Sequence, residues 1–326
     1  MNILVTGGSG FVGINLLEEL LYHGHRVFNY DRQPLLRQAE ESLGEMVSHY
    51  HWVEGDVLDG VRIRETLQRC KIDTVIHTAV ITADEARERR GMRSTFEINC
   101  CGTIEMLQAA VECGVSRFVY VSSIALYGNT AHCAEKLTED MTNLMPQTLY
   151  EISKFASEKI ALRYKALYGL DLTSVRLGDV FGPWERPTGV RNLMSAPYQT
   201  LKIAIQGQTA VLPRPNRTNW VYSRDVARAI CHVAEKRHLH QNVLNIGGPE
   251  VWSIEKWCQA LQKRFTEFHY VIDPTDANVR YHALQDNAVL DITALRSDGE
   301  FCPAFGLEEA LADYCTWAGR FGYLMT

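Results

Sequence analysis

The sequence of 326 residues has no Cys-x-x-Cys pair, no apolar run long enough to cross a membrane, and no basic amino-terminal segment followed by an apolar one. Its nine cysteines also lack the regular spacing of a zinc site or a disulfide framework. We therefore expect reduced thiols, a cytoplasmic location, no membrane contact and no bound metal.

Clustered positive charge is missing as well. The formal net charge is -6 at pH 7, and the lysines and arginines are scattered along the chain. Proteins that bind nucleic acid or an anionic membrane surface need basic residues gathered in a patch or stripe. We therefore expect neither as a partner.

Short β-branched runs alternate with longer amphipathic stretches in the first half of the chain. We predict strands at residues 3–6, 26–30, 52–54, 74–77, 118–121 and 172–177, and helices at 11–23, 61–70, 96–113 and 147–168. This alternation predicts an α/β fold with a doubly wound parallel sheet of the Rossmann type.

The character of the sequence changes at residue 179, where a proline-rich stretch with little strand periodicity begins. Such a stretch is typical of a substrate-facing region attached to a regular sheet. We expect residues 1–178 with 220–247 to form a dinucleotide-binding domain. Residues 179–219 with 248–326 would then form a smaller, carboxyl-terminal α/β lobe that binds substrate.

A glycine-rich turn follows the first predicted strand and opens the first predicted helix. Its glycines are Gly7, Gly10 and Gly13, and Phe11 and Val12 begin the helix. Glycines allow a tight turn and a close approach of the backbone to a pyrophosphate, while the helix terminus supplies unpaired N–H groups. An ordinary turn is the alternative, but the strand before it and the helix after it favour a dinucleotide site.

Asp31 ends the second predicted strand, where a carboxylate can accept hydrogen bonds from the adenosine ribose. The same carboxylate repels a phosphate on that ribose, so Asp31 favours NAD over NADP. Arg32 keeps NADP open as an alternative, because its guanidinium can pair with the phosphate. Asp56 and Val57 follow the third strand and can hold the adenine edge, although a surface turn explains them almost as well.

Tyr150 and Lys154 stand one helical turn apart on one face of a predicted helix. A nearby fixed cation favours the phenolate, which lets a tyrosine exchange a proton with an alcohol. Ser123 lies at the carboxyl end of a buried strand, the edge at which doubly wound sheets bind ligands, and can donate to a developing oxyanion. An exposed helix pair is the alternative interpretation of Tyr150 and Lys154.

Together these motifs resemble the extended short-chain dehydrogenase/reductase family, which includes nucleotide-sugar epimerases and dehydratases. The resemblance implies that Tyr150 is the general acid/base, that Lys154 also bonds the nicotinamide ribose, and that Ser123 positions the reacting oxygen. It also implies a homodimer packed through helices near 96–113 and 147–168. Further cofactor-lining positions follow from the resemblance: Thr78, Ala79, Val80, Asn99, Leu177 and Val180.

Four positions bear on the reaction and its substrate. Dehydratases and decarboxylases of the family usually carry acidic residues after the catalytic hydroxyl, but here Ile124 and Ala125 stand there. We therefore predict an NAD-dependent sugar oxidoreductase of epimerase type, acting through a transient ketone. Asp179 and Arg217 are the candidate substrate contacts.

Two other functions remain open from the sequence. Asp179 would repel a substrate diphosphate, and Thr218 replaces an arginine common in the family, so a dehydrogenase of a nucleotide-free hydroxy acid, uronate or polyol is one alternative. A non-catalytic dinucleotide-sensing protein is the other, although it would not need Ser123, Tyr150 and Lys154 together.

Histidines recur at alternate positions in three places along the chain. No acidic or cysteine cluster accompanies these pairs in the sequence, which favours solvated strand edges over a zinc site. The three pairs are His23 with His25, His49 with His51, and His238 with His240.

Overall fold

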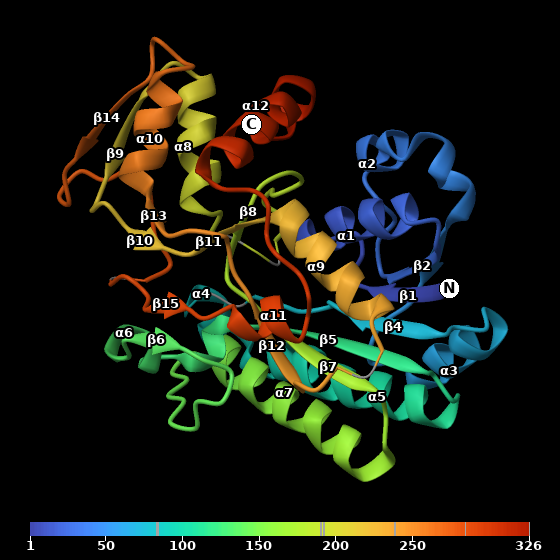
Figure 1. The fold of residues 1–326 in the computed structure, drawn as a ribbon. Helices are drawn as coiled ribbons and strands as arrows, with labels where there is room; N and C mark the ends of the chain where they lie inside the picture. Colours follow the sequence, from blue (N-terminus) through green and yellow to red (C-terminus); the bar gives the residue numbers. More distant parts are fainter. Residues whose placement is uncertain (83–84, 190, 192, 238, 284, 326) are drawn as a thin grey trace.

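The structure is a computed structural model that describes residues 1–82, 85–189, 191, 193–237, 239–283 and 285–325. Its central sheet has seven strands in the order β12-β7-β5-β4-β1-β2-β3, and all neighbours are parallel (Figure 1). The strands are β1 (Asn2–Thr6), β2 (Arg26–Asp31), β3 (Tyr50–Glu54), β4 (Thr74–His77), β5 (Arg117–Ser123), β7 (Leu172–Leu177) and β12 (Val243–Ile246). The order 3-2-1-4-5 confirms the predicted doubly wound sheet.

Helices cover both faces of this sheet because its strands are apolar on both sides. In β1, Ile3 and Val5 join one hydrophobic cluster together with α1 (Phe11–Tyr22) and α9 (Ser223–Glu235). Leu4, between them, joins a second cluster on the other face, with three further helices. These are α3 (Gly60–Arg69), α5 (Gly102–Glu112) and α7 (Leu149–Tyr168).

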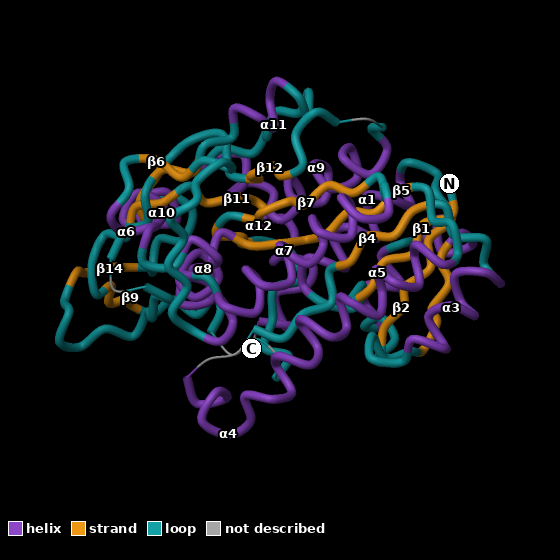
Figure 2. Tube along the Cα trace, turned by 90° about the horizontal axis from the view of Figure 1, so that it is seen from below, coloured by secondary structure: helices purple, strands orange, loops and turns teal. Residues whose placement is uncertain are grey.

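The predicted helix 96–113 has a different structure. α4 (Glu85–Phe96) ends at its first residue, a π-helical turn, η2 (Glu97–Cys101), follows, and α5 begins only at Gly102. Within the turn, Asn99 is buried and its side chain bonds both backbone groups of Ile81. The wider turn therefore places the polar side chain of Asn99 on the core side. The periodicity of apolar residues does not reveal such a buried polar position. Figure 2 shows α4 projecting from the helical layer.

A second group of elements packs beside the sheet, around α8 (Ala196–Ile205), α10 (Ile254–Gln262) and α12 (Leu307–Phe321). Its core is aromatic: Trp252 stacks on Trp257 with ring centroids 5.4 Å apart, and Phe181 meets both rings edge-on. The strands of this region are β9 (Thr209–Leu212), which pairs with β14 (His269–Ile272), and β10 (Arg217–Thr218), which pairs with β13 (Trp252–Ser253).

Two further strand pairs join distant parts of the chain. β8 (Asp179–Phe181) pairs in parallel with β11 (Trp220–Tyr222), and β6 (Lys136–Leu137) pairs with β15 (Val289–Leu290). Each pair links a segment expected in the dinucleotide-binding domain to one expected in the smaller lobe, so the two are interleaved.

The remaining elements are short. They are α2 (Arg37–Ser42), α6 (Thr130–Cys133), α11 (Thr293–Ser297), η1 (Gly44–His49), η3 (Ile124–Tyr127) and η4 (Gly322–Met325). None of the described helices combines the length and the apolar composition needed to cross a membrane.

Candidate active site

The glycine-rich turn joins β1 to α1 in a conformation that only glycines permit. Gly7 has a φ of +69°, and a Cβ there would lie 2.8 Å from Cα of Ala79. A Cβ on Gly13 would lie 2.3 Å from the carbonyl oxygen of Gly7. Gly10 precedes α1 without a side-chain cap, and no acidic residue occupies the first turn, which begins with Phe11 and Val12. The helix terminus is therefore available to an anion.

The loop after β4 lies against this turn. The backbone N–H of Ala79 donates to the hydroxyl of Thr6 at 3.1 Å, and the hydroxyl of Thr78 donates to the carbonyl of Thr6. Thr78, Ala79 and Val80 are half-buried there. Asn99 is buried behind the loop, where it holds Ile81, so it supports the loop through the backbone.

Asp31 lies beside the same turn. Its carboxylate accepts from the backbone N–H groups of Ser9 and Gln33, both at 3.1 Å. Burial raises the pKa of Asp31 and outweighs these hydrogen bonds. The adjacent Arg32 is exposed.

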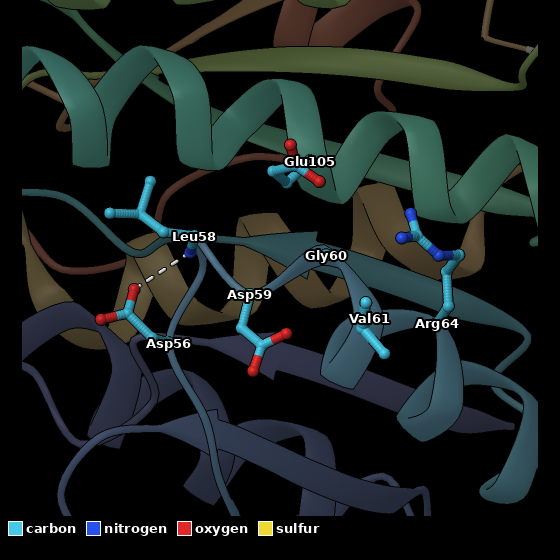
Figure 3. A pocket seen from close by; sticks show the side chains of 7 residues that line it. All are labelled: Asp56, Leu58, Asp59, Gly60, Val61, Arg64 and Glu105. Carbon is cyan, nitrogen blue, oxygen red and sulfur yellow. Dashed lines mark hydrogen bonds between the residues drawn. The ribbon is translucent and has the colours of Figure 1, made fainter.

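Asp56 and Val57 lie in the loop between β3 and α3. The carbonyl of Asp56 accepts from the hydroxyl of Tyr30 at 3.1 Å, and Val57 is buried under Gly102. Asp56 also borders a surface pocket between α3 and α5 (Figure 3). The other lining residues are Leu58, Asp59, Gly60, Val61, Arg64 and Glu105, so none of Ser123, Tyr150 and Lys154 contributes to this pocket.

Ser123 and Tyr150 meet at the carboxyl edge of the sheet. Ser123 ends β5 and Tyr150 is in the first turn of α7, whose start is set by a capping box between Thr148 and Glu151. Burial raises the pKa of Tyr150, whereas hydrogen bonds with Ser123 and Thr82 and the positive charge of Arg191 lower it. The phenol therefore has hydroxyl partners and a cation close by.

Lys154 lies one turn further along α7 and is buried. Its ammonium donates to the carbonyl of Val121 at 2.7 Å and to the hydroxyl of Tyr120 at 2.9 Å. Burial lowers the pKa of Lys154 to about 7, while the carboxylate of Glu158 acts in the opposite direction. Lys154 is thus held against β5, the strand that ends at Ser123.

Of the two candidate substrate residues, Arg217 lines a pocket and Asp179 contacts two other residues that line it. Asp179, in β8, accepts from the hydroxyl of Thr218 at 2.8 Å and from the amide of Asn287 at 3.4 Å. Arg217, Thr218 and Asn287 line that pocket. Burial raises the pKa of Asp179.

Leu177 ends β7 beside Ser123, and Val180 follows in β8, next to Asp179. Leu177 pairs with Ser123 across β7 and β5, and Val180 pairs with Val221 across β8 and β11. Both are therefore held in position by neighbouring strands.

The structure adds site residues that the sequence analysis missed. Thr82 bonds Tyr150, Arg186 donates to the carbonyl of Ser9 at 3.0 Å beside Asp31, and Arg191 lies 2.7 Å from the buried carboxylate of Glu185. Arg191 also covers the ring of Phe11, 5.2 Å from its centroid. Apart from the contact of Arg191 with Glu185, these contacts join segments far apart in sequence, so local spacing contains no signal for them.

This fold is that of a dinucleotide-binding α/β enzyme, and Ser123, Tyr150 and Lys154 gather at the carboxyl edge of its sheet. The sequence profile of the NAD dependent epimerase/dehydratase family matches residues 3–247. The chain belongs to that family. The predicted family, cofactor and class of enzyme are thereby confirmed, and an enzyme is favoured over a non-catalytic sensor.

Two curated relatives illustrate the range of chemistry in the family. The chain is 28% identical over 251 residues to dTDP-D-glucose 4,6-dehydratase of Mus musculus. The matched region makes up 75% of this chain and 67% of the relative. This chain is also 31% identical over 194 residues to UDP-glucuronate 4-epimerase 6 of Arabidopsis thaliana, and that match makes up 57% of this chain and 41% of the relative. The match thus spans only part of these relatives.

A solved structure extends the likeness of fold to the whole chain. The UDP-glucuronic acid 4-epimerase of Bacillus cereus, in complex with UDP-glucuronic acid and NAD, superposes with a TM-score of 0.81 at 22% identity. The superposition covers 98% of this chain and 100% of that one. It therefore includes the elements around α8, α10 and α12 as well as the sheet.

Proposed function

We propose that the protein is a nucleotide-sugar epimerase that oxidises a sugar hydroxyl transiently and reduces the resulting ketone on its other face. The observation that carries the proposal is the meeting of Tyr150 with the hydroxyls of Ser123 and Thr82, one helical turn from the buried ammonium of Lys154. This set can take a proton from an alcohol and later return it.

Each of these residues has its own part in the proposed reaction. Tyr150 accepts the proton of the sugar hydroxyl, and Ser123 holds the reacting oxygen by a hydrogen bond. In its protonated form Lys154 supplies a positive charge, which favours the phenolate form of Tyr150. Bound NAD would accept the hydride from the sugar carbon and give it back.

The glycine-rich turn and its surroundings fit NAD. The close approach of Gly7 to Ala79 and the uncapped start of α1 suit a pyrophosphate, and the carboxylate of Asp31 suits an unphosphorylated ribose. Lys154 would reach the nicotinamide ribose from α7. The remaining proposed cofactor contacts are Gly10, Phe11, Val12, Gly13, Arg32, Asp56, Val57, Thr78, Ala79, Val80, Asn99, Tyr150, Leu177 and Val180.

The residues after Ser123 favour epimerisation over elimination. Expelling water or carbon dioxide needs a second acid or base beside the ketone. Ile124 and Ala125 begin the short helix η3 directly after Ser123 and carry no ionisable group. The ketone would therefore persist until hydride returns.

Asp179 decides how a diphosphate could be accommodated. Burial raises the pKa of this carboxyl group and so favours its neutral form, which can donate a hydrogen bond to a phosphate oxygen. Arg217, which lines the pocket beside Asp179, would supply the positive charge. If Asp179 stays ionised, the site favours the second candidate function, dehydrogenation of a hydroxy acid, uronate or polyol without a nucleotide.

One experiment separates these functions. Purified protein would be denatured and the released dinucleotide identified, and intact protein would be incubated with UDP- and dTDP-sugars and with free uronates, aldonates and polyols. Inversion at one sugar carbon, seen by proton NMR without accumulation of NADH, supports the epimerase. Growth of NADH absorbance with a nucleotide-free substrate supports the dehydrogenase. Accumulation of a keto sugar that has lost one molecule of water would show elimination and would overturn both proposals.

A variant tests the proposed acid/base group. Tyr150→Phe removes the hydroxyl and keeps the ring, so we expect turnover to fall by about 10²–10⁴-fold while the bound dinucleotide is retained. Unchanged turnover on the true substrate would refute the role of Tyr150.

We further propose a cytoplasmic homodimer whose two lobes have the boundaries predicted from the sequence. Ile152 and Tyr168 on α7 and Phe96 at the end of α4 are exposed apolar side chains that suit a subunit contact. Light scattering of the wild type and of Ile152→Glu tests the dimer, and fractionation of the source cells tests the location.

A further inference from the structure

Two histidines, a cysteine and a glutamate meet at the end of the sheet opposite the active site. His23 caps the end of α1 and His25 directly precedes β2, while Cys231 and Glu235 lie one turn apart on α9. Their donor atoms all lie within 4.8 Å of one another. We propose that these four residues bind one zinc ion, which ties α1, β2 and α9 together.

The packing of the chain brings the four side chains together. α1 and α9 lie side by side on one face of the sheet (Figure 1). Gly24, with a φ of +76°, turns the chain sharply between the two histidines, and the helical spacing of Cys231 and Glu235 puts both on one face of α9. Nδ1 of His23 and Nε2 of His25 lie 3.0 and 2.8 Å from the same oxygen of Glu235.

The donor set suits zinc. Imidazole, thiolate and carboxylate are its ordinary protein ligands, and four of them complete a tetrahedral structural site. Two neutral imidazoles, one thiolate and one carboxylate also balance the charge of Zn²⁺. Small shifts of the side chains would bring the four donors to coordination distance, because these atoms already lie within 4.8 Å of one another.

A carboxylate outside the set orients one of the ligands. Nε2 of His23 lies 3.3 Å from Glu19, so Nδ1 is left to face Glu235 and the proposed ion. Such a carboxylate–histidine–metal arrangement fixes the ring and raises its basicity. On the other side, the amino group of Met1 is 3.4 Å from Nδ1 of His25, so Nε2 is the nitrogen that faces the ion.

The access and the setting of the cluster also fit a structural ion. Cys231 is fully buried, whereas His23 and Glu235 are about one-third exposed, which leaves an entry path on the surface. The cluster lies at the amino ends of the strands, while Ser123 and Asp31 lie at the carboxyl ends.

The spacing of histidines alone does not single out this cluster. His49 and His51 have the same spacing, but within the described part of the chain no further cysteine or acidic donors gather around them. The third pair includes His238, which lies outside the described residues. Cys231 and Glu235 are more than 200 residues away from His23 and His25 along the chain. The expectation of no metal considered only residues close to the histidines in sequence, so it did not include these two donors.

Zinc titration of chelator-treated protein, followed by calorimetry and thermal unfolding, tests the proposal. We expect one equivalent of Zn²⁺ to bind and to raise the Tm by a few degrees. Co²⁺ in place of Zn²⁺ should give a thiolate-to-cobalt absorption band in the near ultraviolet. Cys231→Ser should abolish that band, and Glu19→Gln should weaken zinc binding by about tenfold or more.

The matched control is the double variant His49→Gln with His51→Gln, which should bind zinc as the wild type does. Glu235→Gln is a second test that leaves the buried thiol untouched, and it should weaken zinc binding as well. Binding that neither Cys231→Ser nor Glu235→Gln alters, or a cobalt spectrum without a thiolate band, would overturn the proposal. In that case Glu235 would serve only as a hydrogen-bond acceptor for the two histidines.

Discussion

Glu158 and Arg176 form a buried ion pair between the catalytic helix and the sheet. The guanidinium of Arg176 in β7 donates to the carboxylate of Glu158 in α7 at 2.7 Å through one nitrogen and at 3.1 Å through another. Both side chains are almost inaccessible to solvent. Since Glu158 follows Lys154 by one helical turn, the pair holds that part of α7 in register with β7.

Breaking this pair should destabilise the fold strongly. Glu158→Gln removes the charge and leaves the guanidinium of Arg176 buried without its counter-ion, so we expect a loss of about 3–5 kcal/mol in the free energy of unfolding. Urea unfolding followed by circular dichroism measures it. Replacing both residues, Glu158→Leu with Arg176→Met, should restore much of the loss, because the guanidinium is no longer buried without its counter-ion.

An exposed pair provides the control for that measurement. Arg37 and Glu41 lie 2.7 Å apart on the surface of α2, and Glu41→Gln should change stability by less than about 1 kcal/mol. Equal effects of Glu158→Gln and Glu41→Gln would contradict the importance of the buried pair.

Arg191 should set the pH dependence of turnover. Its positive charge lowers the pKa of Tyr150, and the proton acceptor in the reaction is the phenolate. Without that charge the phenol holds its proton to higher pH, so Arg191→Gln should move the acidic limb of the kcat/KM profile toward alkaline pH. At neutral pH we expect kcat/KM to fall several-fold.

Arg163→Gln is the matched control for this profile, because Arg163 is exposed on the same helix as Tyr150. Its pH profile should coincide with that of the wild type. Coinciding profiles for Arg191→Gln and the wild type would refute the assigned influence of Arg191.

Asp31 should determine the choice of dinucleotide. Asp31→Ser removes the carboxylate that repels a ribose phosphate and leaves Arg32 and Arg186 in place. We expect the ratio of NAD to NADP affinity to fall by about tenfold or more, as measured by fluorescence titration of protein freed of dinucleotide. Asp140→Ser, at an exposed acidic residue, should leave the ratio unchanged, and an unchanged ratio in Asp31→Ser would exclude this role.

His77 should make the fold sensitive to acid. It is buried, with its two ring nitrogens 2.8 Å from Thr6 and 3.1 Å from Thr103, and burial lowers its pKa from 6.5 to about 3. Between these pH values the unfolded chain binds a proton that the folded chain does not. The contribution of His77 to stability is therefore fully present above about pH 6.5 and is lost as pH falls toward 3, up to roughly 5 kcal/mol.

His77→Gln removes this titration. Between about pH 7 and about pH 4.5 the wild type should lose roughly 2–3 kcal/mol more of its unfolding free energy than the variant, measured by urea unfolding at both pH values. His49→Gln, at an exposed histidine, should follow the wild type. Parallel losses in the wild type and His77→Gln would show that His77 does not carry the effect.

The sequence by itself determined the features that rest on neighbours along the chain. The alternation of strands and helices, the glycine-rich turn, the end of β2 at Asp31 and the helical spacing of Tyr150 and Lys154 are all set by local backbone geometry. Such periodicities appear directly in the order of residues. They were sufficient to predict the doubly wound sheet and the candidate site at its carboxyl edge.

Only the tertiary structure decided which distant segments meet. It brought Thr82 and Arg191 to Tyr150 and Arg186 to the glycine-rich turn, and it placed Cys231 and Glu235 around His23 and His25. It also introduced the π-helical turn at Glu97–Cys101, where burial of Asn99 overrides the apolar period. Contacts of this kind depend on how helices pack on the sheet, and packing joins residues at separations that no local spacing rule contains.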